Sequence, residues 1–296
     1  MTIRTLADNM RHLPILFIVG PPRSGSTLLF QLLTDRYRVS YPAKLWCRLA
    51  RTPLGGGLAR IACALAQRRQ RGHGYRHSSY GQVVTGGPLA PAECGTLFHR
   101  DLPIGRSESG KTVKPLRSLP RDLRDLARVS DLPVVAKKLV VGNWLRSVTT
   151  AFPEAIFVHI HRDPFFNAQS ILLARRERTL PFTTDWGPVP RSDRPTERAG
   201  EPFLAAWQVI GMNQQIQADL RAYVAPERRY TVQYESMLTA PEETLRAIAE
   251  GARGLRPREP QGSLGEFASG NRLRLSESDA RDLRTALDAL AGAPSR

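Results

Sequence analysis

The stretch that most constrains this chain is residues 14–31, where an apolar run leads through a glycine-containing turn into an apolar helix pattern. The run 15–19 reads Ile-Leu-Phe-Ile-Val, which is typical of a buried strand. Gly20 and Gly25 bracket the turn, and apolar residues at helical spacing follow Thr27. A strand, turn and helix of this kind direct unpaired backbone N–H groups at one place, so the stretch predicts an anion site.

The turn has the glycine spacing of the nucleotide phosphate loop G-x-x-x-x-G-K-[ST], with Gly20, Gly25 and Thr27 in place. Ser26 stands where that loop carries the lysine that reaches the β- and γ-phosphates of a nucleoside triphosphate. Hydrolysis of ATP or GTP is therefore disfavoured, and Arg23 supplies a cation earlier in the loop. The pattern favours a 5′-phosphate-like group with a shorter charged tail.

Residues 22–29, Pro-Arg-Ser-Gly-Ser-Thr-Leu-Leu, resemble the 5′-phosphosulfate loop of the sulfotransferases, which use 3′-phosphoadenosine-5′-phosphosulfate (PAPS) as sulfuryl donor. A second run, residues 157–170, resembles the 3′-phosphate motif of that family, in which Arg-Asp-Pro is followed by a serine. The chemistry agrees, because a phosphomonoester needs a guanidinium fork and a hydroxyl donor, here Arg162 and Ser170. Both motifs follow a predicted strand, and ligands of parallel sheets bind at such ends.

A third segment, residues 229–245, resembles the family's Y-E-D-L … P … L segment, in which the tyrosine lies near the adenine. Tyr234 takes that position, although Ser236 and Met237 depart from the usual D-L. The resemblance thus implies a donor site drawn from the three segments and the C-terminal region: Arg23, Ser24, Gly25, Ser26, Thr27, Leu28, Arg162, Ser170, Tyr234 and Arg272. No metal ion is expected in it.

The reaction needs a base for the acceptor hydroxyl and positive groups for the leaving phosphate. Arg23 serves the second purpose. The resemblance to carbohydrate-type and bacterial members implies a glutamate base, for which we take Glu93, with burial expected to raise its pKa toward working pH. Cytosolic members use a histidine, so His99 is the rival, followed by the two histidines at 159 and 161.

A lysine is expected at the bridging oxygen or the sulfuryl group. Lys138 resembles the lysine of a "K … N … R" stretch in bacterial members, continued here by Asn143 and Arg146. The spacing differs by one residue, so Lys137 stays open as the alternative.

Strands are predicted at residues 15–19, 133–139, 155–160 and 229–234, with helices between them at 119–129, 143–151, 164–178 and 202–223. Two further helices are expected at 241–252 and 276–291. This alternation predicts a three-layer α/β fold with a central parallel sheet. The resemblance makes it the sulfotransferase form of the P-loop nucleoside-triphosphate-hydrolase-like fold, as a single domain over 1–296.

Residues 40–130 and 179–200 lie outside the motifs, and we expect them to be variable insertions that choose the acceptor. Within the first, 40–46 and 71–118 read as loops, and the second, rich in proline, reads as an irregular excursion or lid. Apolar residues at helical spacing from Leu58, with arginines around them, predict a basic amphipathic helix. It packs on the core as a surface helix, or it contacts an acidic acceptor or a membrane surface.

The formal net charge is +16, with 38 arginines among 43 basic residues, which reflects codon bias or an anionic ligand. Cys47, Cys63 and Cys94 form no C-x-x-C pair, so a reducing compartment and a cytoplasmic protein are expected, without a transmembrane segment. We therefore expect a PAPS-dependent sulfotransferase acting on a hydroxyl, less readily an amine, of a carbohydrate, lipid or small metabolite. The alternatives are an ATP-dependent phosphotransferase and a basic nucleic-acid-binding protein, although no nucleic-acid-binding module is present and no nucleic-acid partner is expected.

Overall fold

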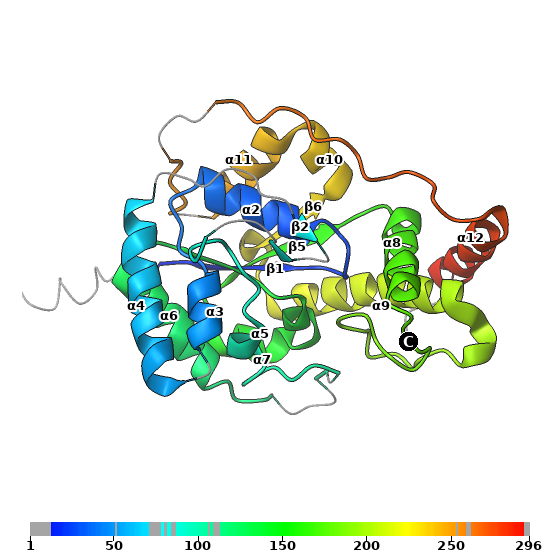
Figure 1. Cartoon of the computed structure of the whole chain (residues 1–296), viewed down its shortest axis with the longest axis horizontal. Helices are drawn as coiled ribbons and strands as arrows, with labels where there is room; N and C mark the ends of the chain where they lie inside the picture. The colour runs from blue at the N-terminus through cyan, green and yellow to red at the C-terminus, as the bar shows by residue number, and fades with distance from the viewer. Residues whose placement is uncertain are drawn as a thin grey trace, which may run out of the picture.

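The computed structural model describes residues 13–50, 52–70, 78–79, 82–83, 87–105, 107–108, 113–252, 254–258 and 262–292. Its centre is a four-stranded parallel sheet in the order β4-β1-β5-β6 (Figure 1). The strands are β1 (Ile15–Val19), β4 (Val134–Lys137), β5 (Ile156–His161) and β6 (Arg229–Gln233). All four predicted strands are confirmed, and so is the α/β fold class. A single domain over 1–296 stays a prediction.

The strand order places the loop after β1 at a special position. From β1 the chain moves to β4 on one side and then to β5 on the other side, so the order reverses at β1. The register sets Ile18 opposite Lys137 in β4 and Val19 opposite His159 in β5. Ligands of open parallel sheets bind beyond the carboxyl ends of the strands at such a reversal.

Helices cover both faces of the sheet. In Figure 1, α2 (Ser26–Arg36), α10 (Tyr234–Thr239) and α11 (Pro241–Gly251) lie above it, and α6 (Ser118–Ser130), α7 (Leu145–Ala151) and α9 (Gly200–Tyr223) lie below. Beyond the sheet, α8 (Pro164–Glu177) and α12 (Glu277–Ala291) pack against α9 around a second apolar cluster. None of the helices in the described ranges has the length and apolar composition that crossing a bilayer requires.

Two predicted loops contain secondary structure. A helix, α3 (Lys44–Leu49), begins inside 40–46, where buried Trp46 anchors it to the core. Within 71–118, the strands β2 (Ser78–Ser79) and β3 (Gln82–Val83) pair antiparallel, and α5 (Gly95–Phe98) follows. These elements are too short to show periodicity. The rest of 71–86 and residues 106 and 109–112 lie outside the described residues.

Helix boundaries differ at three further places. The predicted basic helix, α4 (Pro53–Arg69), starts five residues before Leu58, because Pro53 suits a first helical turn. The helix predicted from Asn143 is preceded by a 3₁₀ turn, Leu139–Asn143, and α7 follows it. The short α10 directly after β6 was not predicted.

The proline-rich segment 179–200 is held against α9. Gln208 donates hydrogen bonds to the carbonyl oxygens of Trp186 (2.7 Å) and Pro188 (2.8 Å). The Arg191 guanidinium donates to Oδ1 of buried Asp219 at 2.6 Å. Its only described helix is a 3₁₀ turn, Glu197–Ala199. The structure thus presents an irregular but anchored wall where a lid was expected.

Candidate functional site

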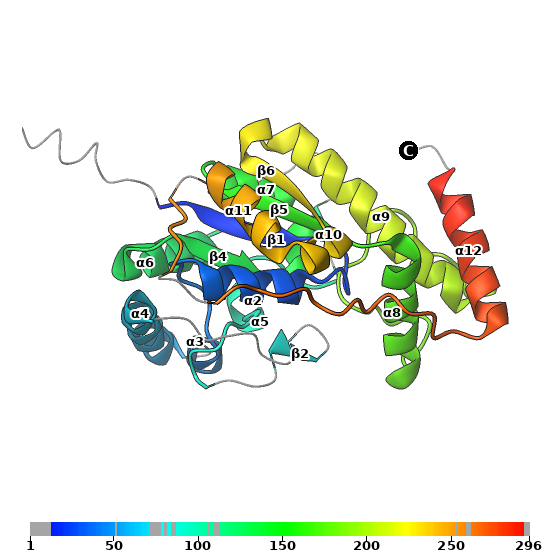
Figure 2. The same ribbon diagram turned by 90° about the horizontal axis from the view of Figure 1, so that it is seen from above.

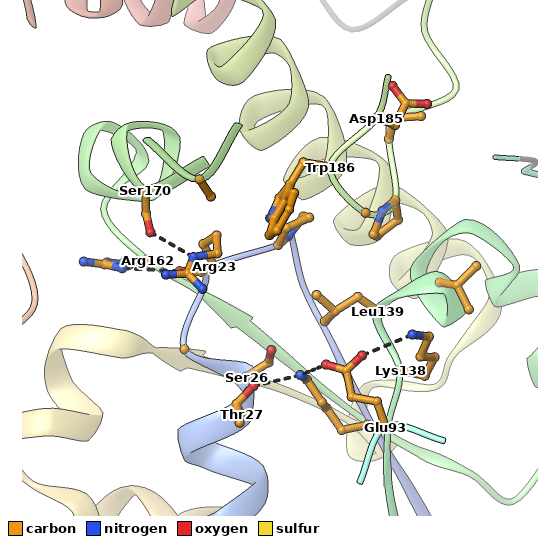
Figure 3. Close-up of a pocket in the computed structure, with 18 of the residues that line it drawn as sticks. Arg23, Ser26, Thr27, Glu93, Lys138, Leu139, Arg162, Ser170, Asp185 and Trp186 are labelled. Atoms are coloured by element: carbon orange, nitrogen blue, oxygen red, sulfur yellow. Dashed lines mark hydrogen bonds and ion pairs between the residues drawn. The ribbon is translucent and has the colours of Figure 1, made fainter. Parts of the chain in front are cut away.

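A cavity of about 1140 Å³ lies at the carboxyl ends of β1, β4 and β5 (Figure 3). The loop after β1, α8, the segment 179–200 and the C-terminal region all contribute to its lining. It collects most of the predicted site residues: Arg23, Gly25, Ser26, Thr27, Leu28, Glu93, Lys138, Arg162, Ser170 and Tyr234. Lys137 and His99, the alternatives, line it as well.

The two predicted phosphate motifs meet in this cavity. Nε of Arg23 donates a hydrogen bond to Oγ of Ser170 at 2.9 Å, and Nη1 of Arg162 donates to the carbonyl oxygen of Arg23 at 3.3 Å. Arg23 has a φ of 66°, a left-handed conformation that is uncommon outside glycine. The two motifs are therefore neighbours, and one ligand can reach both.

Gly25 makes the close approach between the loop and Tyr234 possible. Its φ is 92°, and a Cβ at this position would lie 2.3 Å from Cδ2 of the Tyr234 ring. Helix α2 begins at the next residue, so the N–H groups of its first turn have no acceptor within the helix. The loop thus offers N–H donors and a helix dipole to an anion.

Arg162 is a buried cation whose direct contacts are to neutral groups. Its side chain stacks on Tyr234, with the guanidinium carbon 4.7 Å from the ring centroid, and its Nε donates to Oδ1 of Asn271 at 2.8 Å. Burial lowers the pKa of Arg162, with Arg274 adding to the effect, while Tyr234 and Glu235 act in the opposite direction. A phosphate placed here would stabilise the guanidinium.

Asn271 links Arg162 to the start of α8. Its Nδ2 donates to Oε1 of Glu235 at 2.7 Å, and the same oxygen accepts from the backbone N of Asp163 at 3.1 Å. Asp163 in turn caps α8 by accepting from the N of Phe166 at 3.0 Å. Sequence reasoning missed Asn271, because it lies in a loop without a pattern.

Two of the predicted donor-site residues do not line the cavity. Arg272 is exposed, and its carbonyl oxygen accepts from Gln169, whereas Arg274 does line the cavity. Ser24 is fully buried, and its Oγ makes no hydrogen bond with the described chain. At the C-terminal end the cation of the cavity is therefore Arg274.

Glu93 lies between the two lysines at the end of β4 (Figure 3). Nζ of Lys137 forms an ion pair with Glu93 and donates to Oγ1 of Thr27 at 2.8 Å. Nζ of Lys138 lies 3.1 Å from Oε2 of the same carboxylate. Lys137 is buried and contacts the loop after β1, whereas Lys138 is 19% exposed.

These contacts correct the expectation for Glu93. Burial favours the neutral acid, as predicted, but attraction to Lys137 and Lys138 outweighs it and holds the pKa of Glu93 below its ordinary 4.5. Burial lowers the pKa of Lys137, while Glu93 raises it. Glu93 is consequently a carboxylate at neutral pH, the form that a general base requires, with its oxygens paired to the two lysines.

Of the three candidate histidines, only His99 lines the cavity. Burial and then Lys138 lower its pKa, and its buried Nε2 makes no hydrogen bond with the described chain. Nε2 of His159 lies 3.0 Å from Oδ1 of Asn213, and burial lowers the pKa of His159 to about 4. His161 does not line the cavity either, so His99 is the remaining rival to Glu93.

One side of the cavity is lined largely by apolar residues. Trp186 points into it from segment 179–200, across from Leu139 (Figure 3). Nδ2 of Asn143 donates to the carbonyl oxygen of Val189 at 2.7 Å and so fixes the wall to the end of β4. Its apolar members are Ile104, Leu139, Val140, Trp186, Pro188, Val189 and Pro190, and the charged residues Asp185 and Arg191 of segment 179–200 line the cavity beside them. Both predicted insertions therefore contribute to the cavity.

Comparison with known proteins supports the sequence resemblance. The profile of the sulfotransferase family matches residues 14–253, which is most of the chain. The chain belongs to the sulfotransferase family. A search of curated proteins gave no match to this sulfotransferase.

Solved structures agree at the level of the fold. Sulfotransferase STF9 from Mycobacterium avium aligns with a TM-score of 0.54 at 16% identity, over 99% of this chain and 71% of that one. The sulfotransferase domain of the Synechococcus PCC 7002 olefin synthase gives 0.46 at 18% identity, over 96% and 90%. A sulfotransferase from Alicyclobacillus acidocaldarius gives 0.47 at 12% identity, over 94% and 92%.

Proposed function

We propose that this sulfotransferase transfers a sulfuryl group from PAPS to the hydroxyl of an acceptor that carries an apolar part. The observation that carries the proposal is the meeting of Arg23, Arg162 and Ser170 beside the N-terminus of α2. This arrangement offers two positions for anions, and they lie close together because hydrogen bonds join the two motifs. A nucleotide with phosphate groups on both its 3′ and 5′ oxygens requires such a pair.

The residues fit the donor in detail. The first turn of α2 and Arg23 suit the 5′-phosphosulfate, and Arg162 with Ser170 suits the 3′-phosphate. Tyr234, stacked under Arg162, offers a flat surface for the adenine. In the described part of the chain, no three His, Cys, Asp or Glu side chains group as metal ligands.

We assign the chemical roles as follows. Glu93 accepts the proton of the acceptor hydroxyl while the new O–S bond forms and the bond between sulfur and the 5′-phosphate oxygen breaks. The phosphate leaves as part of 3′-phosphoadenosine-5′-phosphate (PAP), and Arg23 and the loop N–H groups stabilise its charge. Lys137 lies between Thr27 and Glu93, a position that suits contact with the oxygen that bridges the sulfur and the 5′-phosphate. Lys138 contacts the Glu93 carboxylate and orients this base.

The part of the cavity that would hold the acceptor indicates a narrower class of acceptor than the sequence motifs do. Apolar residues around Trp186 and Leu139 make up much of this side of the cavity, with Asp185 and Arg191 beside them, and apolar groups of a ligand bind favourably to such residues. A lipid or an apolar metabolite that carries a hydroxyl therefore fits better than a free sugar. The three cysteines are free thiols, which agrees with the proposed cytoplasmic location.

Mass spectrometry tests the reaction directly. With PAPS present, a library of hydroxylated apolar compounds should give products heavier by one sulfuryl group. The Glu93→Gln variant should turn over more slowly while binding PAP with unchanged affinity. A fully active Glu93→Gln enzyme would remove Glu93 as the base and favour His99.

A melting experiment separates the proposal from the ATP-dependent alternative. PAP at 100 times its Kd should stabilise the fold by about 2.7 kcal/mol, which raises the Tm by several degrees. ATP with magnesium should raise it much less, because Ser26 replaces the lysine that would hold the γ-phosphate. A larger shift with ATP than with PAP contradicts the proposed donor.

A further inference from the structure

Helix α4 presents its larger apolar residues to solvent. Ala59, Cys63, Ala64 and Gln67 form its buried face. Leu58, Ile61 and Leu65 are exposed by 61%, 42% and 51%. A surface helix normally does the reverse and buries its large aliphatic side chains. Because these three residues are spaced three and four apart, they form one stripe along the helix.

The stripe continues onto the neighbouring helix. Leu49, at the end of α3, is 43% exposed. The two helices touch there, because a Cβ on Gly56 of α4 would lie 3.2 Å from Cα of Ala50. We call Leu49, Leu58, Ile61 and Leu65 the α4 patch. Single exposed leucines are common on proteins, but a group of this kind marks a surface that binds something.

Arginines flank the α4 patch at the ends of α3 and α4. Arg48, Arg68 and Arg69 are exposed at the ends of the two helices. Arg68 has a carboxylate, that of exposed Asp131, only at 4.0 Å. On α6, the carboxylates of Asp122 and Asp125 both pair with Arg60 of α4, at 2.6 and 3.0 Å. The surface is therefore apolar at its centre and basic at its rim, on a chain with net charge +16.

This composition selects one kind of partner. Helices that lie in the plane of a membrane have aliphatic residues on one face and Lys or Arg beside it. Each basic residue near an anionic lipid surface adds to the attraction. A second copy of this chain would instead bring the same arginines together, which costs energy. We propose that the α4 patch binds the surface of an anionic membrane, with its aliphatic side chains at the boundary of headgroups and acyl chains.

The position of α4 keeps such binding separate from catalysis. In both views α4 lies at the opposite end of the molecule from α8 and α12 (Figures 1 and 2). The cavity is lined by α8 residues, among them Ser170 and Ala174, and by none of the four residues of the α4 patch. A membrane on α4 therefore leaves the cavity accessible, and the inference does not depend on the proposed function.

Sedimentation with vesicles tests the inference on the full chain. The protein should sediment with vesicles of phosphatidylcholine mixed with phosphatidylglycerol and remain in the supernatant with phosphatidylcholine alone. The triple variant Leu58→Ser, Ile61→Ser, Leu65→Ser should lower the partition coefficient by about tenfold or more. The matched control is Leu273→Ser, whose side chain is 54% exposed in the C-terminal region, and it should sediment like the unaltered protein.

A variant that removes two positive charges provides a second test of vesicle binding. Arg68→Gln with Arg69→Gln should weaken vesicle binding and reduce its dependence on salt. The melting temperature of each variant, measured without lipid, shows that the fold is intact. Failure of the unaltered protein to bind anionic vesicles overturns the inference, and so does equal binding by the triple variant. A dimer in size-exclusion chromatography that the triple variant converts to monomers also overturns it, because a second copy would then cover the patch.

Discussion

Arg162 contacts three parts of the predicted donor site. It donates hydrogen bonds to the carbonyl oxygen of Arg23, in the loop after β1, and to Oδ1 of Asn271. Its guanidinium also stacks on the ring of Tyr234. Among neutral partners the buried guanidinium keeps unused capacity to bind an anion. Its position joins the loop, the strand end of β5 and the C-terminal region in one place.

Arg162→Ala should weaken PAP binding by about 1.5–3 kcal/mol, the scale of hydrogen bonds to charged groups. Isothermal titration calorimetry with PAP measures the change. Arg272→Ala is the matched control, since Arg272 is exposed and does not line the cavity, and it should bind PAP normally. Unchanged affinity in Arg162→Ala would reject the 3′-phosphate role.

The lysine pair should set the pH dependence of the reaction. Because Lys137 and Lys138 hold the pKa of Glu93 below 4.5, the acidic limb of kcat/KM should lie below that pH. Lys138→Gln removes one of the two cations, so the pKa of Glu93 rises and the limb moves to higher pH. Lys44→Gln, outside the cavity lining, should leave the profile in place.

A profile of Lys138→Gln that coincides with that of the unaltered enzyme would contradict this assignment. The pH profile of the Glu93→Gln variant distinguishes Glu93 from His99 as the general base. The Glu93 carboxylate raises the pKa of His99, so its removal would shift a His99-dependent limb to lower pH. A Glu93-dependent limb would disappear.

At the scale of elements, an ion-pair network joins α8, the helix of the 3′-phosphate motif, to α9 and α12. Arg176 of α8 donates two hydrogen bonds of 2.8 Å to Asp279 of α12 and one of 3.0 Å to Glu201 of α9. Hydrogen bonds from Arg176, and then from Ser276, lower the pKa of Asp279 to about 2. Three helices are thereby joined at one guanidinium.

Asp279→Asn should lower the free energy of unfolding at pH 7, by the scale of up to about 1 kcal/mol known for exposed ion pairs. The pKa of Asp279 is lowered by folding, so its contribution is present above the ordinary 3.8 and is lost as the pH falls through about 2. Urea unfolding across this range measures it, with Asp282→Asn as the control in the same helix. A difference as large at pH 2 as at pH 7 contradicts the argument.

At the scale of the whole molecule, the C-terminal segment 262–276 joins distant parts. It runs from the region of α11 to α12, shown in orange to red in Figures 1 and 2. The backbone N of Phe267 donates to the carbonyl oxygen of Leu238 at 2.9 Å, and Asn271 and Arg274 bond elements of the donor side. Phe267 and Ala268 line the cavity.

If PAP binds in this cavity, it should slow amide hydrogen exchange in the loop 20–29 and in 265–275 together. Mass spectrometry of peptides from exchanged protein, with and without PAP, measures this. Peptides of α6, which lies away from the cavity, provide the internal control. Protection of the loop without protection of 265–275 would show that the C-terminal segment takes no part in donor binding.

The sequence by itself determined the sheet and the two phosphate motifs. Strands such as 15–19 are continuous apolar runs, and each motif lies within about a dozen residues of the strand before it. Local backbone geometry then brings the motif's groups together, so Arg23 and Gly25, or Arg162 and Ser170, could be named without a structure. Their chemical roles stay predictions until binding is measured.

Only the tertiary structure decided the state of Glu93, the placement of Arg274 rather than Arg272 in the cavity lining and the exposure of the α4 patch. A pKa depends on charges within a few ångströms, and those of Lys137 and Lys138 reach Glu93 only when the first insertion folds over β4. Helical periodicity shows which residues share a face, but not which face is turned inward. In α4 the small residues Ala59, Cys63 and Ala64 are the ones that pack inward, and this leaves Leu58, Ile61 and Leu65 outside.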